Sequence, residues 1–182
     1  MHPDDVRLME RVKRDDADAF ERLFRKYERK VLNFFHKICF SQTLAEDLTQ
    51  ETFVRLWFSR HSYRPDAGRF STYLFQIAKN CWYSLSRSDR RRAEAKKAEI
   101  EEAAAGGRSD DPLRRVESAE LHAEVRAAVA ALPEESRIPF VLSRYTGLKY
   151  DEIAQILSVS LRTVERRIGE AVRLLAERLV GK

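Results

Sequence analysis

The feature that most constrains the fold of this chain is the segment 150–168, in which two short amphipathic stretches flank a tight turn. In the first stretch, Ile153, Ala154 and Leu157 recur at helical spacing and predict one buried face. Ser160 follows the turn and is suited to cap a second helix. That helix would bury a further apolar set: Val164, Ile168, Ala171 and Val172. Because Ala154 is small, the second helix can cross closely over the first.

The two predicted helices have the layout of a helix-turn-helix, whose second helix enters the major groove of DNA. The outward face of that helix would carry Arg162, Thr163, Arg166 and Arg167. Two packed helices with a polar outer face also occur in all-α proteins that bind no DNA, and Glu165 and Glu170 would be repelled by phosphates. The motif therefore favours double-stranded DNA as a ligand and leaves a structural helix pair as the alternative.

The composition favours a mostly helical fold, because 43% of the 182 residues are hydrophobic and only 6 glycines and 5 prolines are present. No apolar run is long enough to cross a membrane, and the N-terminal residues lack the pattern of a signal peptide. Cys39 and Cys81 lie in predicted helices among apolar neighbours, which indicates free thiols in a reducing compartment. We therefore expect an all-α protein in the cytoplasm.

Charge and helix-breaking residues divide the chain into two domains. The net charge is +5, and six basic residues accompany a single acid, Asp89, between Arg69 and Arg92. Such a concentration of charge is typical of a face that binds a polyanion. Residues 106–112 (Gly-Gly-Arg-Ser-Asp-Asp-Pro) have the composition of a linker. We expect an N-terminal helical domain over residues 1–93, a flexible linker over 94–117 and a C-terminal domain over 118–182.

Hydrophobic periodicity predicts four helices in each domain. The N-terminal helices cover about Pro3–Arg14, Ala17–Cys39, Thr43–Ser59 and Ser71–Arg92, with a loop from His61 to Gly68. The C-terminal helices cover about 119–131 and 133–145, followed by the helix-turn-helix and a final stretch to Val180. Thr43 and Glu46 suit a capping box, Ser71 suits an N-cap, and Gly147 suits a left-handed helix terminator.

The fourth predicted helix combines amides, aromatic rings and arginines. Its core-facing set is Leu74, Ile77, Ala78, Cys81 and Leu85, and another side carries Gln76, Asn80, Tyr83, Arg87 and Arg91. Taken singly, Phe70, Phe75 and Trp82 are better explained as core residues. With Tyr73 nearby, the combination suits a surface that stacks on unpaired bases, each worth about 1–3 kcal/mol, and contacts phosphates. The alternative is that the rings fill the core and the arginines are only solvated.

The third predicted helix has an acidic outward face made by Asp47, Gln50 and Glu51. Like charges four residues apart disfavour an isolated helix slightly, although acids near a helix N-terminus favour the helix dipole and Arg55 can pair with Glu51. An acidic patch on a basic domain indicates a basic protein partner rather than DNA.

Signatures of catalysis are missing from the sequence. The four histidines are scattered, and His36 and Cys39 form no complete metal site. There is no glycine-rich phosphate loop and no recognisable nucleophile motif. We therefore expect no enzyme activity, no catalytic residues, no metal, no cofactor and no small-molecule substrate.

Three segments carry a family resemblance: residues 45–57 (AEDLTQETFVRLW), residues 70–80 (FSTYLFQIAKN) and the helix-turn-helix. Together with residues 132–137 (LPEESR), they resemble bacterial RNA polymerase sigma factors of the extracytoplasmic-function class. The resemblance covers nearly the whole chain in the order and spacing of that family. It implies a transcription initiation factor that binds core RNA polymerase, recognises the −35 and −10 promoter elements and promotes strand opening. Family members are often held by an anti-sigma factor.

The resemblance also assigns roles to residues at matching positions. Asp47, Gln50 and Glu51 lie where the family contacts the clamp helices of the polymerase. The positions for the −10 element and for melting are His61, Tyr63, Arg64, Phe70, Tyr73, Gln76, Lys79, Asn80, Tyr83, Arg87, Arg90 and Arg91. The positions for the −35 element are Ser160, Arg162, Thr163, Arg166 and Arg167. The segment 94–117 corresponds to a linker threaded through the polymerase, and melting would be driven by capture of an extruded base.

The chain departs from the family pattern at Lys149, where a capping Ser or Thr is usual, at Ser158, where Gly is usual, and at Glu165, where Lys is frequent. These changes keep the fold but indicate either an unusual −35 preference or a weak dependence on the −35 element. Two other functions remain open from the sequence. One is a two-domain helix-turn-helix regulator that does not act as a polymerase subunit, and the other is an enzyme acting on DNA, which would need a catalytic α/β domain that the N-terminal half does not predict.

Overall fold

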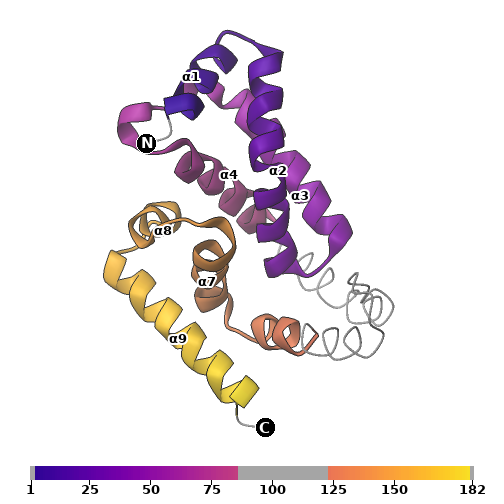
Figure 1. Ribbon diagram of the computed structural model, residues 1–182, viewed down its shortest axis with the longest axis vertical. Coiled ribbons are helices and arrows are strands. Elements are labelled where there is room, and N and C mark those ends of the chain that lie inside the picture. Colours follow the sequence, from indigo (N-terminus) through magenta and orange to yellow (C-terminus); the bar gives the residue numbers. More distant parts are fainter. Residues whose placement is uncertain (1–2, 86–122, 181–182) are drawn as a thin grey trace.

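The computed structural model describes residues 3–85 and 123–180, and every regular element in those two ranges is helical (Figure 1). The first range holds α1 (Pro3–Val12), α2 (Ala17–Cys39), α3 (Gln42–Phe58), α4 (Phe70–Ser84) and the short 3-10 turns η1 (Arg60–Ser62) and η2 (Pro65–Ala67). The second holds a helix over 123–130, α7 (Glu134–Thr146), α8 (Tyr150–Leu157) and α9 (Leu161–Val180). The all-α prediction is confirmed for these residues.

The N-terminal part is built around the long helix α2. Asp16 is its N-cap, with Oδ1 accepting a hydrogen bond from the Ala19 N–H at 3.0 Å, and Asp15 adopts a left-handed backbone (φ 62°) that separates α2 from α1. The apolar stripe of α2 from Leu23 to Cys39 is buried, and Phe34 packs edge-on against Phe75 of α4. The predicted bounds of α2 are therefore confirmed.

A buried polar cluster fastens α1 to α2. Asp5 is 3% exposed and accepts hydrogen bonds from the Tyr27 hydroxyl at 2.7 Å and from Lys26 Nζ at 2.5 Å. Burial, followed by the bond to Asp5, raises the pKa of Tyr27 far above its usual value. The Tyr27 ring packs edge-on against Phe70, the first residue of α4. The cluster thus links α1 to the helix that the sequence assigns to DNA.

Several predicted helix starts differ from the structure. The cap of α3 is Ser41, whose Oγ accepts from the Leu44 N–H at 3.3 Å, so the predicted Thr43–Glu46 capping box is wrong and Glu46 bonds to Gln42 instead. The chain reverses at Phe40, whose left-handed backbone makes Ser41 the first extended residue before α3. Helix α4 starts at Phe70, and its N-cap is Arg69, whose side chain makes no capping hydrogen bond, so Ser71 does not cap the helix.

Two predicted helix ends are also too late. Helix α1 stops at Val12 rather than Arg14. Helix α4 stops at Ser84, because Leu85 is extended and its N–H bonds to the Trp82 carbonyl, while the Ser84 hydroxyl donates to Cys81. A serine hydroxyl that competes for a helical carbonyl favours such an end. The rest of the predicted stretch to Arg92, and the linker 94–117, lie outside the described residues.

The C-terminal part contains the predicted helix-turn-helix. Gly147 ends α7 with a left-handed backbone (φ 74°), and Ser158 (φ 56°) forms the turn after α8. Ser160 Oγ accepts from the Thr163 N–H at 3.1 Å and so caps α9 as predicted. Val164, Ile168 and Ala171 are buried, but Val172 is 42% exposed. The prediction for Val172 is wrong because the buried stripe of α9 is too narrow to include it.

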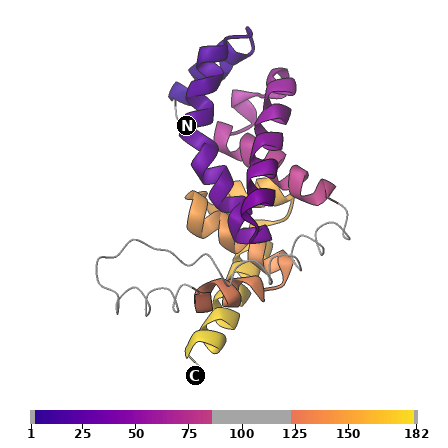
Figure 2. The ribbon, with the colours of Figure 1, turned by 90° about the vertical axis from the view of Figure 1, so that its right-hand side faces the viewer.

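The two parts pack against each other, α7 against α2 and α8 against α4 (Figures 1 and 2). Arg137 of α7 is buried; its guanidinium donates to the Ala130 carbonyl at 2.9 Å and lies over the Phe40 ring. Lys37 of α2 lies over the Tyr145 ring. In both views the last turns of α9 lie at the opposite end of the molecule from α1. Within the described ranges, no helix has the length and apolar character needed to cross a membrane.

Candidate protein and nucleic-acid interfaces

The first candidate interface is the outward face of α3. Asp47, Gln50 and Glu51 are all exposed, as predicted. Glu51 pairs with Arg55, Oε1 to Nε at 2.6 Å, and the Arg55 side chain is itself 43% exposed, so the pair remains on the surface. Asp47 has no ion-pair partner among the residues that the structure describes. The carboxylates are therefore available to a cationic partner.

The same face of α3 continues into apolar residues that the sequence analysis did not single out. Val54 is 48% exposed and Phe58 is 77% exposed. They follow Asp47 and Glu51 at helical spacing, so the four side chains form one stripe. That spacing was present in the sequence, but the two acidic residues precede the two apolar ones along the stripe, so this face is half polar and half apolar and gives no amphipathic signal.

The second candidate interface is a hollow of about 220 Å³ beside the loop between α3 and α4. Its lining comes from the loop, from the first turns of α4 and from Gln155 of α8: Ser62, Tyr63, Arg64, Ala67, Gly68, Arg69, Thr72, Tyr73, Gln76 and Gln155. The structure thus brings together four residues assigned to the −10 element, namely Tyr63, Arg64, Tyr73 and Gln76. His61 is exposed on the same loop but does not line the hollow.

The loop is held in place by its own contacts. The Tyr73 hydroxyl donates to the Ser59 carbonyl at 2.7 Å. Arg60 lies 4.7 Å above the centre of the Trp57 ring, donates to the Trp57 carbonyl and pairs with Asp15. These contacts attach the start of the loop to α3, to α4 and to Asp15.

Two residues assigned to the −10 element are buried. Tyr63 and Phe70 are each 2% exposed, and their rings pack edge-on against each other. In this structure neither ring has an exposed face on which a base could stack, and the assignment of both residues to the −10 element stays a prediction. Phe70 belongs to the core, and Tyr63 forms the floor of the hollow. The Tyr63 and Thr72 hydroxyls have no hydrogen-bond partner among the described residues.

The remaining assigned positions of α4 lie at its surface to different degrees. Asn80 and Tyr83 are exposed, the latter at 48%, whereas Gln76 and Lys79 are half-buried. Burial lowers the pKa of Lys79 below its usual value. Phe75 and Trp82 are buried, as expected of core residues. Arg87, Arg90 and Arg91 lie outside the described residues.

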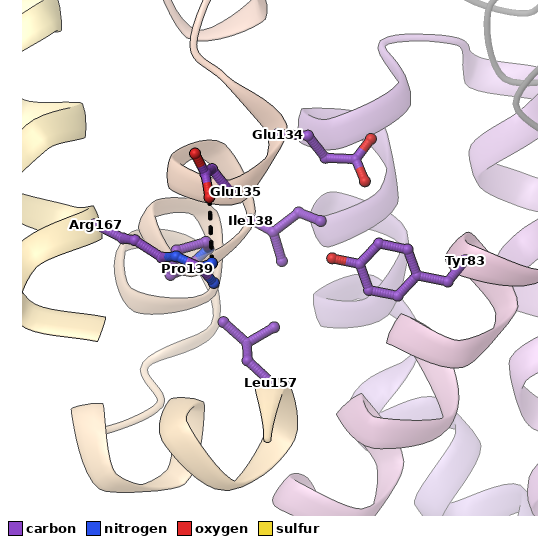
Figure 3. Close-up of a pocket in the computed structure, with 7 residues that line it drawn as sticks. All are labelled: Tyr83, Glu134, Glu135, Ile138, Pro139, Leu157 and Arg167. Atoms are coloured by element: carbon purple, nitrogen blue, oxygen red, sulfur yellow. Dashed lines mark hydrogen bonds and ion pairs between the residues drawn. The ribbon is translucent and has the colours of Figure 1, made fainter. Parts of the chain in front are cut away.

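A second hollow, of about 420 Å³, opens where α4 faces α7 and the helix-turn-helix (Figure 3). Tyr83 projects from α4 toward Ile138 of α7, and Leu157 of α8 lies beside them. Glu135 and Arg167 stand at the side of this hollow, joined by an ion pair at 3.2 Å.

The third candidate interface is the outward face of α9. Ser160, Arg162 and Arg166 are exposed and Thr163 is half-buried. Arg166 lies 3.8 Å from Glu170 in an exposed pair. Arg167 differs, because it is only 22% exposed and pairs with Glu135 of α7. The structure thus leaves Arg162 and Arg166 turned outward and ties Arg167 to its own domain.

The departure at Lys149 also has a structural account. Lys149 is the N-cap of α8, and a lysine side chain cannot accept a hydrogen bond from the helix. Glu152 compensates in part, because its Oε2 accepts from the Lys149 N–H at 2.8 Å. Ser158 takes the left-handed conformation that glycine adopts more easily, and Glu165 is exposed on α9.

Among residues 3–85 and 123–180, no group of three or more His, Cys, Asp or Glu side chains could hold a metal ion. Cys39 and Cys81 are buried, and neither forms a disulfide among the described residues. A helix-turn-helix packed on a helical domain that carries separate acidic and amide-rich faces defines a DNA-binding transcription factor.

Comparisons with known proteins narrow that class. The family model Sigma-70 region 2 matches residues 23–92, and Sigma-70, region 4 matches residues 122–175. The RNA polymerase sigma-H factor of Pseudomonas aeruginosa is 31% identical over 173 residues, covering 92% of this chain and 89% of that protein. The ECF RNA polymerase sigma-E factor of Escherichia coli is 31% identical over 170 residues, covering 90% and 88%. The chain belongs to the sigma-70 family of RNA polymerase sigma factors, in its ECF class.

Solved structures share the fold. CnrH, in complex with the cytosolic domain of CnrY, superposes with a TM-score of 0.73 at 23% identity, covering 98% of this chain and 99% of that chain. The sigma factor RpoE of Bartonella quintana, in complex with the anti-sigma factor NepR, has a TM-score of 0.65 at 19% identity, covering 88% and 96%. As a sigma factor, the chain is a transcription initiation factor that binds core RNA polymerase and promoter DNA. This outcome favours the sigma-factor prediction over the stand-alone regulator.

Proposed function

We propose that three separate surfaces bind the three partners of this chain in transcription initiation. The acidic face of α3 (Asp47, Gln50 and Glu51) binds core RNA polymerase. The hollow beside the 61–68 loop and the exposed side of α4 bind the −10 element, and the outward face of α9 binds the −35 element. The observation that carries the proposal is the difference in charge between the assigned residues: Asp47 and Glu51 are exposed carboxylates of α3, whereas the residues assigned on the loop, α4 and α9 are amides, hydroxyls, rings and cations.

The hollow suits an extruded base of the −10 element. It is lined by Arg64, Arg69 and Gln76, which can hydrogen-bond base edges and phosphates. The hydroxyls of Tyr63 and Thr72, two residues that line the hollow, have no hydrogen-bond partner among the described residues, and a buried hydroxyl without a partner is costly. Capture of a base there would repay the few kcal/mol that unstacking costs. Asn80 and Tyr83 extend this surface along α4.

The −35 contacts fall chiefly to Arg162 and Arg166, which are exposed and can reach base edges or phosphates. Ser160 and Thr163 at the start of α9 are placed to bond the backbone of the duplex. We propose that Arg167 contributes only when its pair with Glu135 opens.

We also propose that the chain carries out no bond chemistry, acts in the cytoplasm with the polymerase and is regulated by an anti-sigma factor. The structural neighbour RpoE was solved with the anti-sigma factor NepR, and CnrH was solved with the cytosolic domain of CnrY. Two relatives are named as RNA polymerase sigma factors.

The polymerase assignment is tested with three neutralised variants of the full chain. Asp47→Asn and Glu51→Gln remove charges on the proposed face. Glu28→Gln removes an exposed charge from α2 and serves as the control. Titration of purified core RNA polymerase should show slower association and a flatter salt dependence for the first two variants and not for the third. Equal effects of Glu28→Gln and Glu51→Gln would contradict the assignment.

A further inference from the structure

Helix α3 presents an unusual distribution of side chains on its two sides. Thr49 and Thr52 point into the core, where they are 4% and 0% exposed. Their hydroxyls donate to the Ala45 and Leu48 carbonyls at 2.6 and 2.7 Å, so their burial leaves no unpaired group. The opposite side exposes Val54 and Phe58. The helix thus buries hydroxyls and leaves two apolar side chains in solvent.

Single exposed apolar residues are normal on protein surfaces and need no explanation. Val54 and Phe58 differ because they continue the acidic stripe without a break. Asp47, Glu51, Val54 and Phe58 are spaced by four, three and four residues, the spacing of a seam that packs against another helix. Gln50 lies beside this seam. One half of the stripe is acidic, and the other half is apolar.

We infer that Val54 and Phe58 are the apolar anchor of the polymerase interface, and that they insert between side chains of a helical, basic segment of core RNA polymerase. The inference rests on the proposed function, because the partner is the one assigned to Asp47 and Glu51. Two observations identify the partner. Val54 and Phe58 continue the acidic face that is assigned to the polymerase, and the negative charge of the same seam is complementary to a basic segment. Aromatic side chains near the centre of an interface carry a large share of binding energy, because they bury much apolar area with little loss of freedom.

The two halves of the stripe should act on different steps of binding. Exposed charges steer the encounter and set the salt dependence of association. Buried apolar anchors slow dissociation, and their effect does not depend on salt. Phe58 and Val54 are therefore distinguishable from Asp47 and Glu51 in a kinetic experiment, even though all four lie on one helix.

The test measures dissociation of the full chain from purified core RNA polymerase at low and high salt. Phe58→Ala should dissociate roughly thirtyfold faster at both salt concentrations. Val54→Ala should show a smaller increase of the same kind, and Phe58→Leu should recover part of the loss. Val172→Ala is a matched control, because Val172 is 42% exposed, close to the 48% of Val54, but lies on α9.

The possible results separate the two proposals. The proposal that Val54 and Phe58 anchor the interface would be overturned if dissociation were unchanged in both Phe58→Ala and Val54→Ala. An equal effect of Val172→Ala would overturn it as well. If Asp47→Asn and Glu51→Gln still slow association, the acidic interface stands without it. If none of the four variants changes binding, α3 is not the polymerase interface. Thermal unfolding of Phe58→Ala should match the parent protein, because the ring is 77% exposed and supports no core.

Discussion

Arg69 and Glu152 form an ion pair that joins the two parts of the chain, with Nε 3.5 Å from Oε1. Glu152 is 6% exposed at the start of α8, and its other oxygen caps that helix through the Lys149 N–H. Gln76 reinforces the junction by donating to the Gln155 carbonyl at 3.4 Å. A single carboxylate therefore supports the helix-turn-helix and holds it against the loop of the proposed −10 site. In this arrangement α8 covers part of the hollow.

Loss of this pair should let the two parts separate more often. Arg69→Ala removes the partner of a buried carboxylate, and we expect the junction to weaken by about 1 kcal/mol. Amide hydrogen exchange in residues 62–76 and 150–157 should then rise several-fold, since exchange follows the population of opened states. Arg64→Ala removes a neighbouring exposed arginine that makes no ion pair among the described residues, and it should leave exchange unchanged. Similar exchange in both variants would show that the pair does not hold the junction.

The pair between Glu135 and Arg167 should restrain duplex binding. Glu135→Gln removes the carboxylate and releases Arg167 toward a phosphate. Affinity for the duplex should therefore increase, and the slope of log affinity against log salt concentration should steepen by up to about one unit, the release of one further counterion. The double variant Glu135→Gln with Arg167→Ala should lose that gain. Fluorescence anisotropy of a labelled duplex over a salt series measures both quantities. A slope that is the same for the single and the double variant would mean that Arg167 contacts no phosphate.

The Asp5 cluster should stabilise the N-terminal part. Tyr27→Phe removes the hydroxyl that donates to a buried carboxylate, and this should lower the free energy of unfolding by about 1–3 kcal/mol. Urea denaturation measures the change. Tyr150→Phe removes a hydroxyl from a ring that is 39% exposed and serves as the control, with a change near zero. If the two variants are equally stable, the bond to Asp5 contributes nothing net.

The cap of α2 should make stability depend on pH at the acid end. The Ala19 N–H bond and then the Arg11 side chain hold the pKa of Asp16 below its ordinary 3.8. The ionised form is therefore favoured by the fold, so its stabilisation is present above that ordinary value and is lost as pH falls through the lower folded pKa. Asp16→Asn keeps a cap that does not titrate, and its urea midpoint should fall less between about pH 5 and pH 2.

The control for this prediction is Asp18→Asn, which neutralises an acid in the first turn of α2 but leaves the Asp16 cap in place. Its urea midpoint should fall with pH as in the parent protein. An acid-induced loss in Asp16→Asn as large as in the parent would show that the cap does not titrate within this range.

Local signals in the sequence were sufficient for much of the fold. The α2 bounds, the Gly147 terminator and the Ser160 cap all follow from short-range rules, because a cap or a left-handed residue acts within one turn of its helix. The start of α3 could not be predicted in the same way. Ser41 and Thr43 are both good caps, and the choice between them depended on the chain reversal at Phe40, which is fixed by packing.

The sequence by itself determined an all-α chain with an acidic α3 and a basic helix-turn-helix, because helical periodicity and residue type are local properties, and the sigma-factor family followed from the resemblance of its motifs. Only the tertiary structure decided which assigned residues are accessible. It buried Tyr63 and Phe70, paired Arg167 with Glu135 and placed Glu152 against Arg69, because burial and ion pairing depend on residues far apart in the chain. It also left Val54 and Phe58 exposed, because other side chains of α3 fill the core on the opposite side of that helix.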